Sequence, residues 1–323
     1  MQEVVPRGSR LQLVTHRGGT SEDEMWGLRA DVIDAFAEIA PTIDIAFDPK
    51  GVDADIVVMM AGSTISSDPG ASMDRAELGR RNAEVFTGYA QALADHPRQP
   101  LVIVQSNPVE LGVRIFSEHV PRHRVMGAAG FSDTLRFSHE IGVDFGVARS
   151  AVRSLVLGQH GDYLVPIWSQ VHIRGVDEQK LVEYIAGVRE GRDLADLPDE
   201  IRAGKARMLE LVRDGQVERA LEFVNSLPAD VRFAVRPFFT HFTAGRTTEA
   251  ATANAVSWLV SLIMYSIPMV ASAQVSLEGE WEGITGVTAA PVLLAPNGWS
   301  HVLPAQLADD ELALLRRAVE AAA

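Results

Sequence analysis

The chain has 323 residues, enough for one large domain or two ordinary ones, and its 47% hydrophobic and 22% charged content is typical of a folded globular protein. Its formal net charge of −14 argues against a nucleic-acid-binding surface, which needs a basic stripe. The sequence contains no cysteine, which excludes disulfides, thiolate nucleophiles and cysteine metal sites. The first ten residues contain no apolar stretch of signal-peptide length, so we expect a cytoplasmic protein.

Strands alternate with helices in the first part of the chain. Four apolar runs are typical of buried strands, at residues 11–15, 43–47, 55–60 and 100–105. Two segments carry apolar residues at helical spacing, at residues 25–40 and 74–93. This alternation predicts a parallel α/β sheet.

From about Arg136 the pattern becomes that of a mixed α+β region. Residues 149–157 and 170–174 alternate like antiparallel strands. Residues 177–227 are charged and helical, with breaks expected at Gly191, Gly204 and Gly215. The C-terminal part predicts three strands and a final amphipathic helix, at residues 270–277, 283–290, 291–295 and 309–323.

One apolar run, residues 255–275, approaches the length of a membrane span. Four serines and Pro268 interrupt it, and a polar segment precedes it. We therefore predict a buried helix followed by a strand, and no membrane contact.

Three short segments contain the residues best suited to chemistry. Asn107 follows a predicted parallel strand, at the edge where open α/β sheets bind ligands. Asp133 and Arg136 are three residues apart within GAAGFSDTLRF and therefore lie on one face of a helix. His160 lies between two glycines, in a turn after a predicted strand. Taken singly, these residues have ordinary explanations as a turn, a surface ion pair and a structural histidine.

The order and spacing of the motifs resemble the lactate/malate dehydrogenase family from about Leu11 to the C-terminus. The matching stretches are ADIVVMMAG, PGASMDRAELGRRN, VIVQSNPVE, RVMGAAGFSDTLRF, LGQHGDYLVPIWS, and LEGEWEGITGV with NGWSHVLP. The resemblance implies an incomplete Rossmann-like parallel sheet over residues 1–135, lacking the first strand and helix. An α+β substrate and catalytic domain would follow over residues 136–323, and a homodimer or homotetramer is expected.

The resemblance gives three residues roles in handling a 2-oxo or 2-hydroxy carboxylate. His160 matches the family's catalytic histidine, which exchanges a proton with the 2-hydroxyl or 2-keto oxygen. An unperturbed imidazole, with a pKa of about 6.5, can do this near neutrality. Asp133 matches the carboxylate that orients the imidazole. Arg136 matches the arginine that holds the substrate carboxylate, for which a planar bidentate guanidinium is better suited than lysine.

Further positions match residues that surround the substrate. Arg75 matches a second arginine beside the family's mobile loop, which polarises the carbonyl or binds a carboxylate. Asn107 matches the asparagine next to the substrate and the nicotinamide. Thr247 or Thr248 lies where the family places a hydroxyl or a small residue.

The loop before Arg75 differs from that of malate-type enzymes, which carry an arginine for the distal carboxylate of the substrate. This loop offers Ser66, Ser67 and Asp68. A second substrate carboxylate is therefore not expected unless Arg246 supplies the charge. A neutral, hydroxylated or amine-bearing tail fits better.

The glycine-rich turn that binds the NAD pyrophosphate in the family has no counterpart in the expected place. The family's second strand matches from about Leu11, and the ten preceding residues are too few for a strand and a crossover helix. In the family the first strand lies between the second and the fourth. Without it, these two strands would lie two strand spacings apart, about 10 Å. The neighbouring strands, residues 2–5 or a partner subunit could fill this gap. Thr15-His16-Arg17 replaces the acidic residue that binds the adenosine ribose, which hints at NADP or at a simple surface turn.

Three functions are open on these grounds. The first is an enzyme in which His160 and Asp133 act as an acid–base pair without a nicotinamide, as a lyase, decarboxylase, isomerase or cyclase in specialised biosynthesis. The second is an NAD(P)-dependent dehydrogenase with an unusual cofactor site, and the third is a non-catalytic binding or scaffold protein. We favour the first and predict no cofactor, with NAD or NADP as the alternative. No metal is expected, because no histidines have a ligand spacing. The helical segment 189–211 is longer than in the family and has no assigned role.

Overall fold

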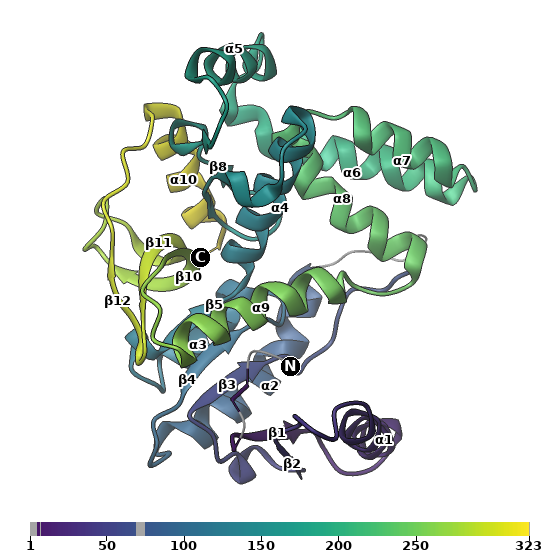
Figure 1. Cartoon of the computed structure of the whole chain (residues 1–323), viewed down its shortest axis with the longest axis vertical. Coiled ribbons are helices and arrows are strands. Elements are labelled where there is room, and N and C mark those ends of the chain that lie inside the picture. The colour runs from purple at the N-terminus through teal and green to yellow at the C-terminus, as the bar shows by residue number, and fades with distance from the viewer. Residues whose placement is uncertain (1–4, 7, 69–74, 323) are drawn as a thin grey trace.

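The computed structural model describes the chain except for residues 1–4, 7, 69–74 and 323 (Figure 1). Within the described part, the main sheet has the strand order β3-β4-β5-β10-β11-β7-β8, and β12 pairs with β11. Its strands are β3 (Ile56–Met59), β4 (Leu101–Val104), β5 (Val125–Gly127), β7 (Val156–Gly158), β8 (Leu164–Pro166), β10 (Val270–Glu278), β11 (Thr285–Ala295) and β12 (Gly298–Val302). Two smaller sheets join β1 (Arg10–Val14) to β2 (Thr42–Ala46), and β6 (Val152–Arg153) to β9 (His172–Ile173).

The helices lie around these sheets, with α6, α7 and α8 side by side next to α4 (Figure 1). In chain order they are α1 (Thr20–Ala35), α2 (Arg75–Ala94), α3 (Val109–Ser117), α4 (Ala129–Phe145), α5 (Glu178–Arg189), α6 (Leu197–Arg213), α7 (Val217–Ser226), α8 (Ala229–Ala244), α9 (Glu249–Met264) and α10 (Asp309–Ala322). The apolar run at 255–275 forms the end of α9 and the start of β10, as predicted. In the described residues, no helix is long and apolar enough to cross a membrane.

The parallel strands are the part of the fold that the sequence describes best. All four residues of β4 are buried, which explains its unbroken apolar run. β3, β4 and β5 pair in parallel, and the sheet then continues through antiparallel strands. This arrangement confirms the predicted Rossmann-like sheet followed by an α+β region. The expected domain boundary at residue 135 falls inside α4, and the division into two domains stays a prediction.

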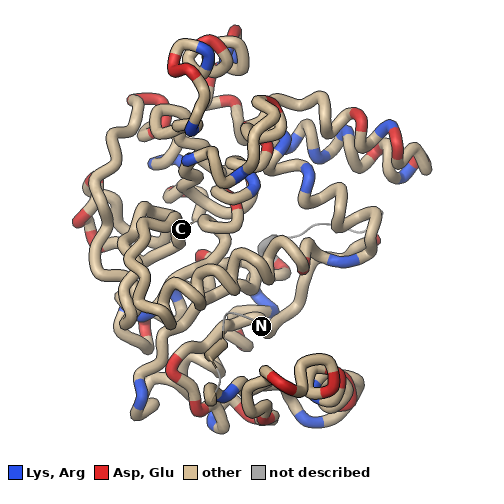
Figure 2. Tube along the Cα trace, viewed as in Figure 1, with Lys and Arg blue, Asp and Glu red and all other residues tan. Residues whose placement is uncertain are grey.

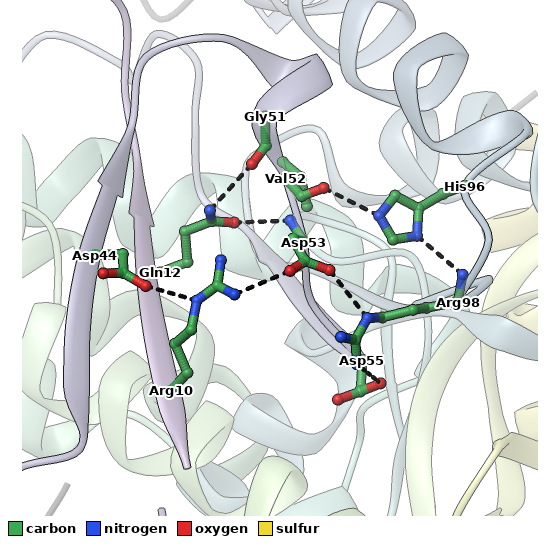
Figure 3. A network of polar contacts seen from close by, with 9 residues as sticks. All are labelled: Arg10, Gln12, Asp44, Gly51, Val52, Asp53, Asp55, His96 and Arg98. Carbon is green, nitrogen blue, oxygen red and sulfur yellow. Dashed lines mark hydrogen bonds and ion pairs between the residues drawn. The ribbon is translucent and has the colours of Figure 1, made fainter.

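In the described residues, β1 and β3 belong to different sheets and share no backbone pairing. Side chains instead connect β1 to the segment that precedes β3. The Gln12 amide donates to the carbonyl of Gly51 at 3.0 Å and accepts the N–H of Asp53 at 2.9 Å, as a peptide group would (Figure 3). The carboxylate of Asp53 also accepts hydrogen bonds from the guanidinium groups of Arg10 and Arg98, each at 2.9 Å. Residues 2–5 are one of three alternatives for filling the gap, and of these, residues 2–4 lie outside the described part of the chain.

Two local expectations are wrong for tertiary reasons. Gly204 does not end a helix but lies inside α6, where a Cβ atom would be 3.0 Å from Val235 of α8, so the glycine allows close packing. The strands expected at 283–290 and 291–295 are the single strand β11, with Pro291 opposite Ser272 of β10. The carbonyl of Pro291 accepts the N–H of Leu303 at 2.8 Å, so the strand continues through the proline.

A buried ion network fixes α4 against α8. Glu140 of α4 is 2% exposed and accepts Arg232 and Arg236 of α8, each at 2.6 Å. Arg232 also reaches Asp144 of α4 at 2.6 Å. Because a buried carboxylate is stable only when its oxygens are paired, this network fixes the position of the helix that carries Asp133.

We predict that Arg232→Met lowers the free energy of unfolding by about 3 kcal/mol, because it leaves Glu140 with incomplete pairing in the interior. Urea unfolding would measure the loss. Arg207→Met is the matched control, because Arg207 pairs with Glu210 in an exposed contact and its removal should change stability by less than about 1 kcal/mol. Equal stability of the two variants would contradict the importance of this network.

Candidate active site

Helix α4 supplies the carboxylate and the guanidinium that the sequence places on one helical face. Asp133 is 2% exposed, and its Oδ1 accepts Nη1 of Arg136 at 2.9 Å. The Arg136 side chain is 16% exposed, so the pair extends from the interior toward solvent. Arginine has five N–H donors, and Asp133 takes one of those of Arg136, so this partly exposed guanidinium can also bind a substrate carboxylate.

The turn between β7 and β8 brings His160 to the same carboxylate. Nδ1 of His160 lies 2.6 Å from Oδ2 of Asp133, and the imidazole is 23% exposed. Burial favours protonation of Asp133, but the adjacent cationic groups of His160 and Arg136 hold its pKa below the ordinary value. An ionised carboxylate only accepts hydrogen bonds, so Nδ1 carries a proton, which makes Nε2 the atom for proton exchange.

Of the two threonines, Thr248 is brought to this cluster. Its Oγ1 accepts Nη2 of Arg136 at 3.0 Å, which fixes the second arm of the guanidinium. Thr247 is exposed, and its carbonyl accepts the N–H of Glu249 at 2.8 Å. Arg246 is also at the surface, 3.6 Å from Glu249.

Asn107 follows β4 and is tied to the loop that follows β3. Its carbonyl accepts Nδ2 of Asn82 at 2.6 Å, and the same Asn82 side chain bonds both the carbonyl and the N–H of Ser63. Gly62 has φ +131°, and a Cβ atom there would lie 2.8 Å from Oδ1 of Asn82. Asn82 thus holds together the carboxyl ends of two parallel strands, where α/β sheets bind ligands.

The loop after Ser63 contacts α8. The carbonyl of Ser66 lies 3.0 Å from Nε2 of His241, a histidine that is 5% exposed. Asp68 is exposed, and its N–H donates to Oγ of Ser66 at 3.1 Å. Arg75 is the first residue of α2, but its side chain lies outside the described part of the structure.

Sequence reasoning missed three residues that touch this region. The buried Glu110 of α3 accepts the backbone N–H of His160 at 2.7 Å. Asn82 ends one of the family-like stretches, and Glu110 ends another, but neither type of residue signals its role. Lys205 of α6 binds Asp162, two residues beyond His160, and no sequence pattern connects them.

Comparison with known proteins agrees with this architecture. Residues 22–127 match the family model of the lactate/malate dehydrogenase, NAD binding domain. A malate dehydrogenase of Syntrophotalea carbinolica is 29% identical over 269 residues, which cover 82% of this chain and 74% of the relative. An L-lactate dehydrogenase of Bacillus caldotenax is 37% identical over 134 residues, 41% of each chain.

Solved structures show the same fold over nearly the whole chain. The malate dehydrogenase of Cryptosporidium parvum has a TM-score of 0.71 at 19% identity, covering 97% of this chain and 96% of that one. The enzyme of Plasmodium falciparum gives 0.72 at 18% identity, covering 97% and 88%. Together with the sequence matches, this places the chain among Rossmann-like α/β enzymes. Its sequence is related to the lactate/malate dehydrogenase family, with the NAD binding domain model matched over residues 22–127 and a malate dehydrogenase matched over 82% of the chain.

The prediction that no cofactor is used is wrong. Residues 22–127 match a family model that is described as an NAD binding domain, which points to NAD. The prediction gave too much weight to one glycine-rich turn. The matched segment instead includes β2 to β5, with the loops that end β3 and β4.

The loops that end β3 and β4 lie at the carboxyl ends of the parallel strands, where α/β sheets bind dinucleotides, and Asn82 joins these loops through Ser63 and Asn107. The glycines before α1 do not offer a comparable anion site, because the N–H of Gly18 donates to Glu22 at 2.8 Å. Arg17, considered above as a ligand for a 2′-phosphate, stacks on Phe47 at 4.5 Å.

Proposed function

We propose that this protein is an NAD-dependent dehydrogenase that interconverts a 2-hydroxy and a 2-oxo carboxylate. The observation that carries the proposal is that one buried carboxylate, that of Asp133, binds His160 with one oxygen and Arg136 with the other. A proton-exchanging imidazole and a carboxylate-binding guanidinium are thereby held side by side. These are the two groups that a 2-hydroxy acid needs from the protein.

NAD supplies hydride chemistry at C2 of the substrate when it is bound. Nε2 of His160 takes the hydroxyl proton as the alcohol is oxidised and returns a proton to the keto oxygen in the reverse direction. Asp133 stabilises the positive charge that the imidazole gains, because Oδ2 lies 2.6 Å from Nδ1. Arg136 holds the substrate carboxylate, and Arg75, Asn107 and Thr248 complete the proposed substrate site, with Thr247 as a further candidate.

The dehydrogenase function is better supported than the nicotinamide-independent chemistry favoured by the sequence. Relatives that match about four fifths of this chain are named malate dehydrogenases, at 82% and 80% coverage, and the matched family model is described as an NAD binding domain. The same relatives support an enzyme rather than a scaffold protein. A cytoplasmic location and a role in specialised biosynthesis stay predictions.

We expect the purified protein to bind NADH, detected by fluorescence titration, and to oxidise it in the presence of a 2-oxo acid. His160→Asn should lower kcat/KM by about 10²- to 10⁴-fold while the Kd for NADH stays unchanged, because the variant removes only the proton-exchanging group. His139→Asn is the control, because it makes the same substitution at an exposed histidine of α4 and should leave kcat/KM unchanged.

Two outcomes would contradict the dehydrogenase function. The first is no binding of NADH at millimolar concentration. The second is NADH oxidation that is as fast in His160→Asn as in the unchanged protein, because the proton would then come from another group.

The tail of the proposed substrate is uncharged or carries an amine, and a distal carboxylate is disfavoured. The loop that follows β3 presents Ser66, Ser67 and the exposed Asp68, and it contacts α8 through His241. In the proposed site this loop faces the substrate tail, and an acidic residue on the loop disfavours a second carboxylate of the substrate. Arg246, which could supply a counter-charge, lies 3.6 Å from Glu249 and is 68% exposed.

We predict that the protein reduces pyruvate-like 2-oxo acids with a higher kcat/KM than oxaloacetate. Asp68→Asn should raise kcat/KM for oxaloacetate about 5-fold relative to pyruvate, as expected for removing one repulsive charge near the surface. Asp214→Asn, which removes an exposed carboxylate at the end of α6, should leave the ratio unchanged. A preference for oxaloacetate that is insensitive to Asp68→Asn would exclude this substrate class.

A homodimer or homotetramer is the proposed assembly. None of the described residues of α1 is buried, and its Trp26, Leu28 and Ile33 are 49%, 42% and 37% exposed. Large apolar side chains gathered on one helix are typical of a surface that contacts another chain. Light scattering should give two or four times the mass of one chain, and Trp26→Ser should reduce it, whereas a monomer at micromolar concentration would contradict the proposal.

A further inference from the structure

Lys205 is a buried lysine on a helix whose neighbouring arginines reach solvent. It is 8% exposed, whereas the side chains of Arg202 and Arg207 on the same helix are 43% and 56% exposed. Figure 2 shows acidic and basic residues together along α6 and α7. An ammonium group is costly to bury unless it is paired, so the position of Lys205 depends on its contacts in the interior.

The contacts of Lys205 lie in the turn that carries His160. Nζ donates to Oδ1 of Asp162 at 2.7 Å and lies 3.4 Å from the carbonyl of Gly161. On its other side, Nζ lies 4.1 Å from the centre of the Phe238 ring of α8, a cation–π contact. One ammonium group therefore joins α6 and α8 to the two residues that follow His160.

The turn itself has a conformation that depends on glycine. Gly158 has φ +83° and Gly161 has φ +151°, values that other residues rarely adopt. A Cβ atom on Gly158 would lie 2.6 Å from the carbonyl of Tyr163. A turn with two such glycines is not rigid by its own sequence, so its position must be fixed by contacts from outside.

Three helices supply those contacts. Glu110 of α3 accepts the backbone N–H of His160, Asp133 of α4 binds the imidazole, and Lys205 of α6 binds the two following residues. The first two contacts fix the beginning of the turn and the ring. The third holds the chain beyond His160, on the side of β8, at 2.7 Å from Asp162, and the more exposed Arg202 of the same helix lies farther from that carboxylate, at 3.9 Å.

We propose that Lys205 is a positioning residue for His160: through Asp162 and Gly161 it keeps the turn in the conformation in which Nδ1 of the imidazole meets Asp133. This inference rests on the proposed function for its kinetic consequences, but its structural readout does not. It also gives a role to the long helical segment around residues 189–211, which carries this ammonium group to the turn.

The test compares Lys205→Met with the unchanged protein. Methionine keeps an unbranched apolar chain against Phe238 and removes the charge. We expect kcat to fall about 10- to 100-fold, because a small displacement of a proton-exchanging group is sufficient for such a loss. The KM for the 2-oxo acid and the Kd for NADH should change less than about 3-fold. Lys205→Arg, which keeps a cation, should recover part of kcat.

The second readout is the downfield proton resonance of Nδ1 in His160, identified as the signal that His160→Asn removes. It should shift or broaden in Lys205→Met and remain in place in Lys180→Met, which changes an exposed lysine of α5. This readout needs no turnover. A protein that fails to oxidise NADH would overturn the proposed function, while the resonance would still report on Lys205.

Asp162→Asn is a second test in case Lys205→Met does not fold. It weakens the same contact by changing a partly exposed residue of the turn and leaves the interior unchanged. It should reproduce both the lower kcat and the altered resonance, and the two substitutions combined should have no larger effect than one. A folded variant of either kind with unchanged kcat and an unchanged His160 resonance would overturn the proposal.

Discussion

The arrangement of the candidate site depends on one buried carboxylate with two cationic partners. Asp133 has almost no exposure, so both of its oxygens need hydrogen-bond donors, and they find them in Arg136 and His160. Either partner alone would leave one oxygen unsatisfied in the interior. The guanidinium of α4 and the imidazole of the β7–β8 turn are therefore held in a fixed relation, although they lie 24 positions apart in the sequence.

Two turns further along α4, a second buried carboxylate is bound by two cationic side chains in the same way. Asp133 and Glu140 are seven residues apart, which places both carboxylates on one face of α4. Glu140 is bound by Arg232 and Arg236 of α8, as Asp133 is bound by Arg136 and His160. One carboxylate fixes α4 within the fold, and the other fixes the reactive side chains on α4. The precision of the site thus derives from how firmly α4 itself is held.

Local patterns in the sequence predicted the elements and one half of this site. The spacing of Asp133 and Arg136 fixes their pairing because both lie on one helix. The contact of His160 with Asp133 spans 27 residues, and that of Glu110 with His160 spans 50, so only the family resemblance suggested the first and nothing suggested the second. Gly204 and Pro291 show the same limit. Each residue type usually breaks an element, but here packing against α8 and pairing with β10 decide.

The wrong prediction about the cofactor has a related cause. It rested on one glycine-rich turn, whereas the match to the NAD binding domain model extends over residues 22–127. The parallel strands β3 and β4 carry firm contacts: β4 is fully buried, and Asn82 ties the loop after β3 to Asn107. β1 and β2 are attached differently, through Gln12 and the partly exposed ion pairs of Asp53 (Figure 3). In the proposed dehydrogenase, hydride transfer makes its strictest geometric demand where the nicotinamide would meet the substrate, and Asn107, which follows the firmly held β4, is proposed to lie beside that point.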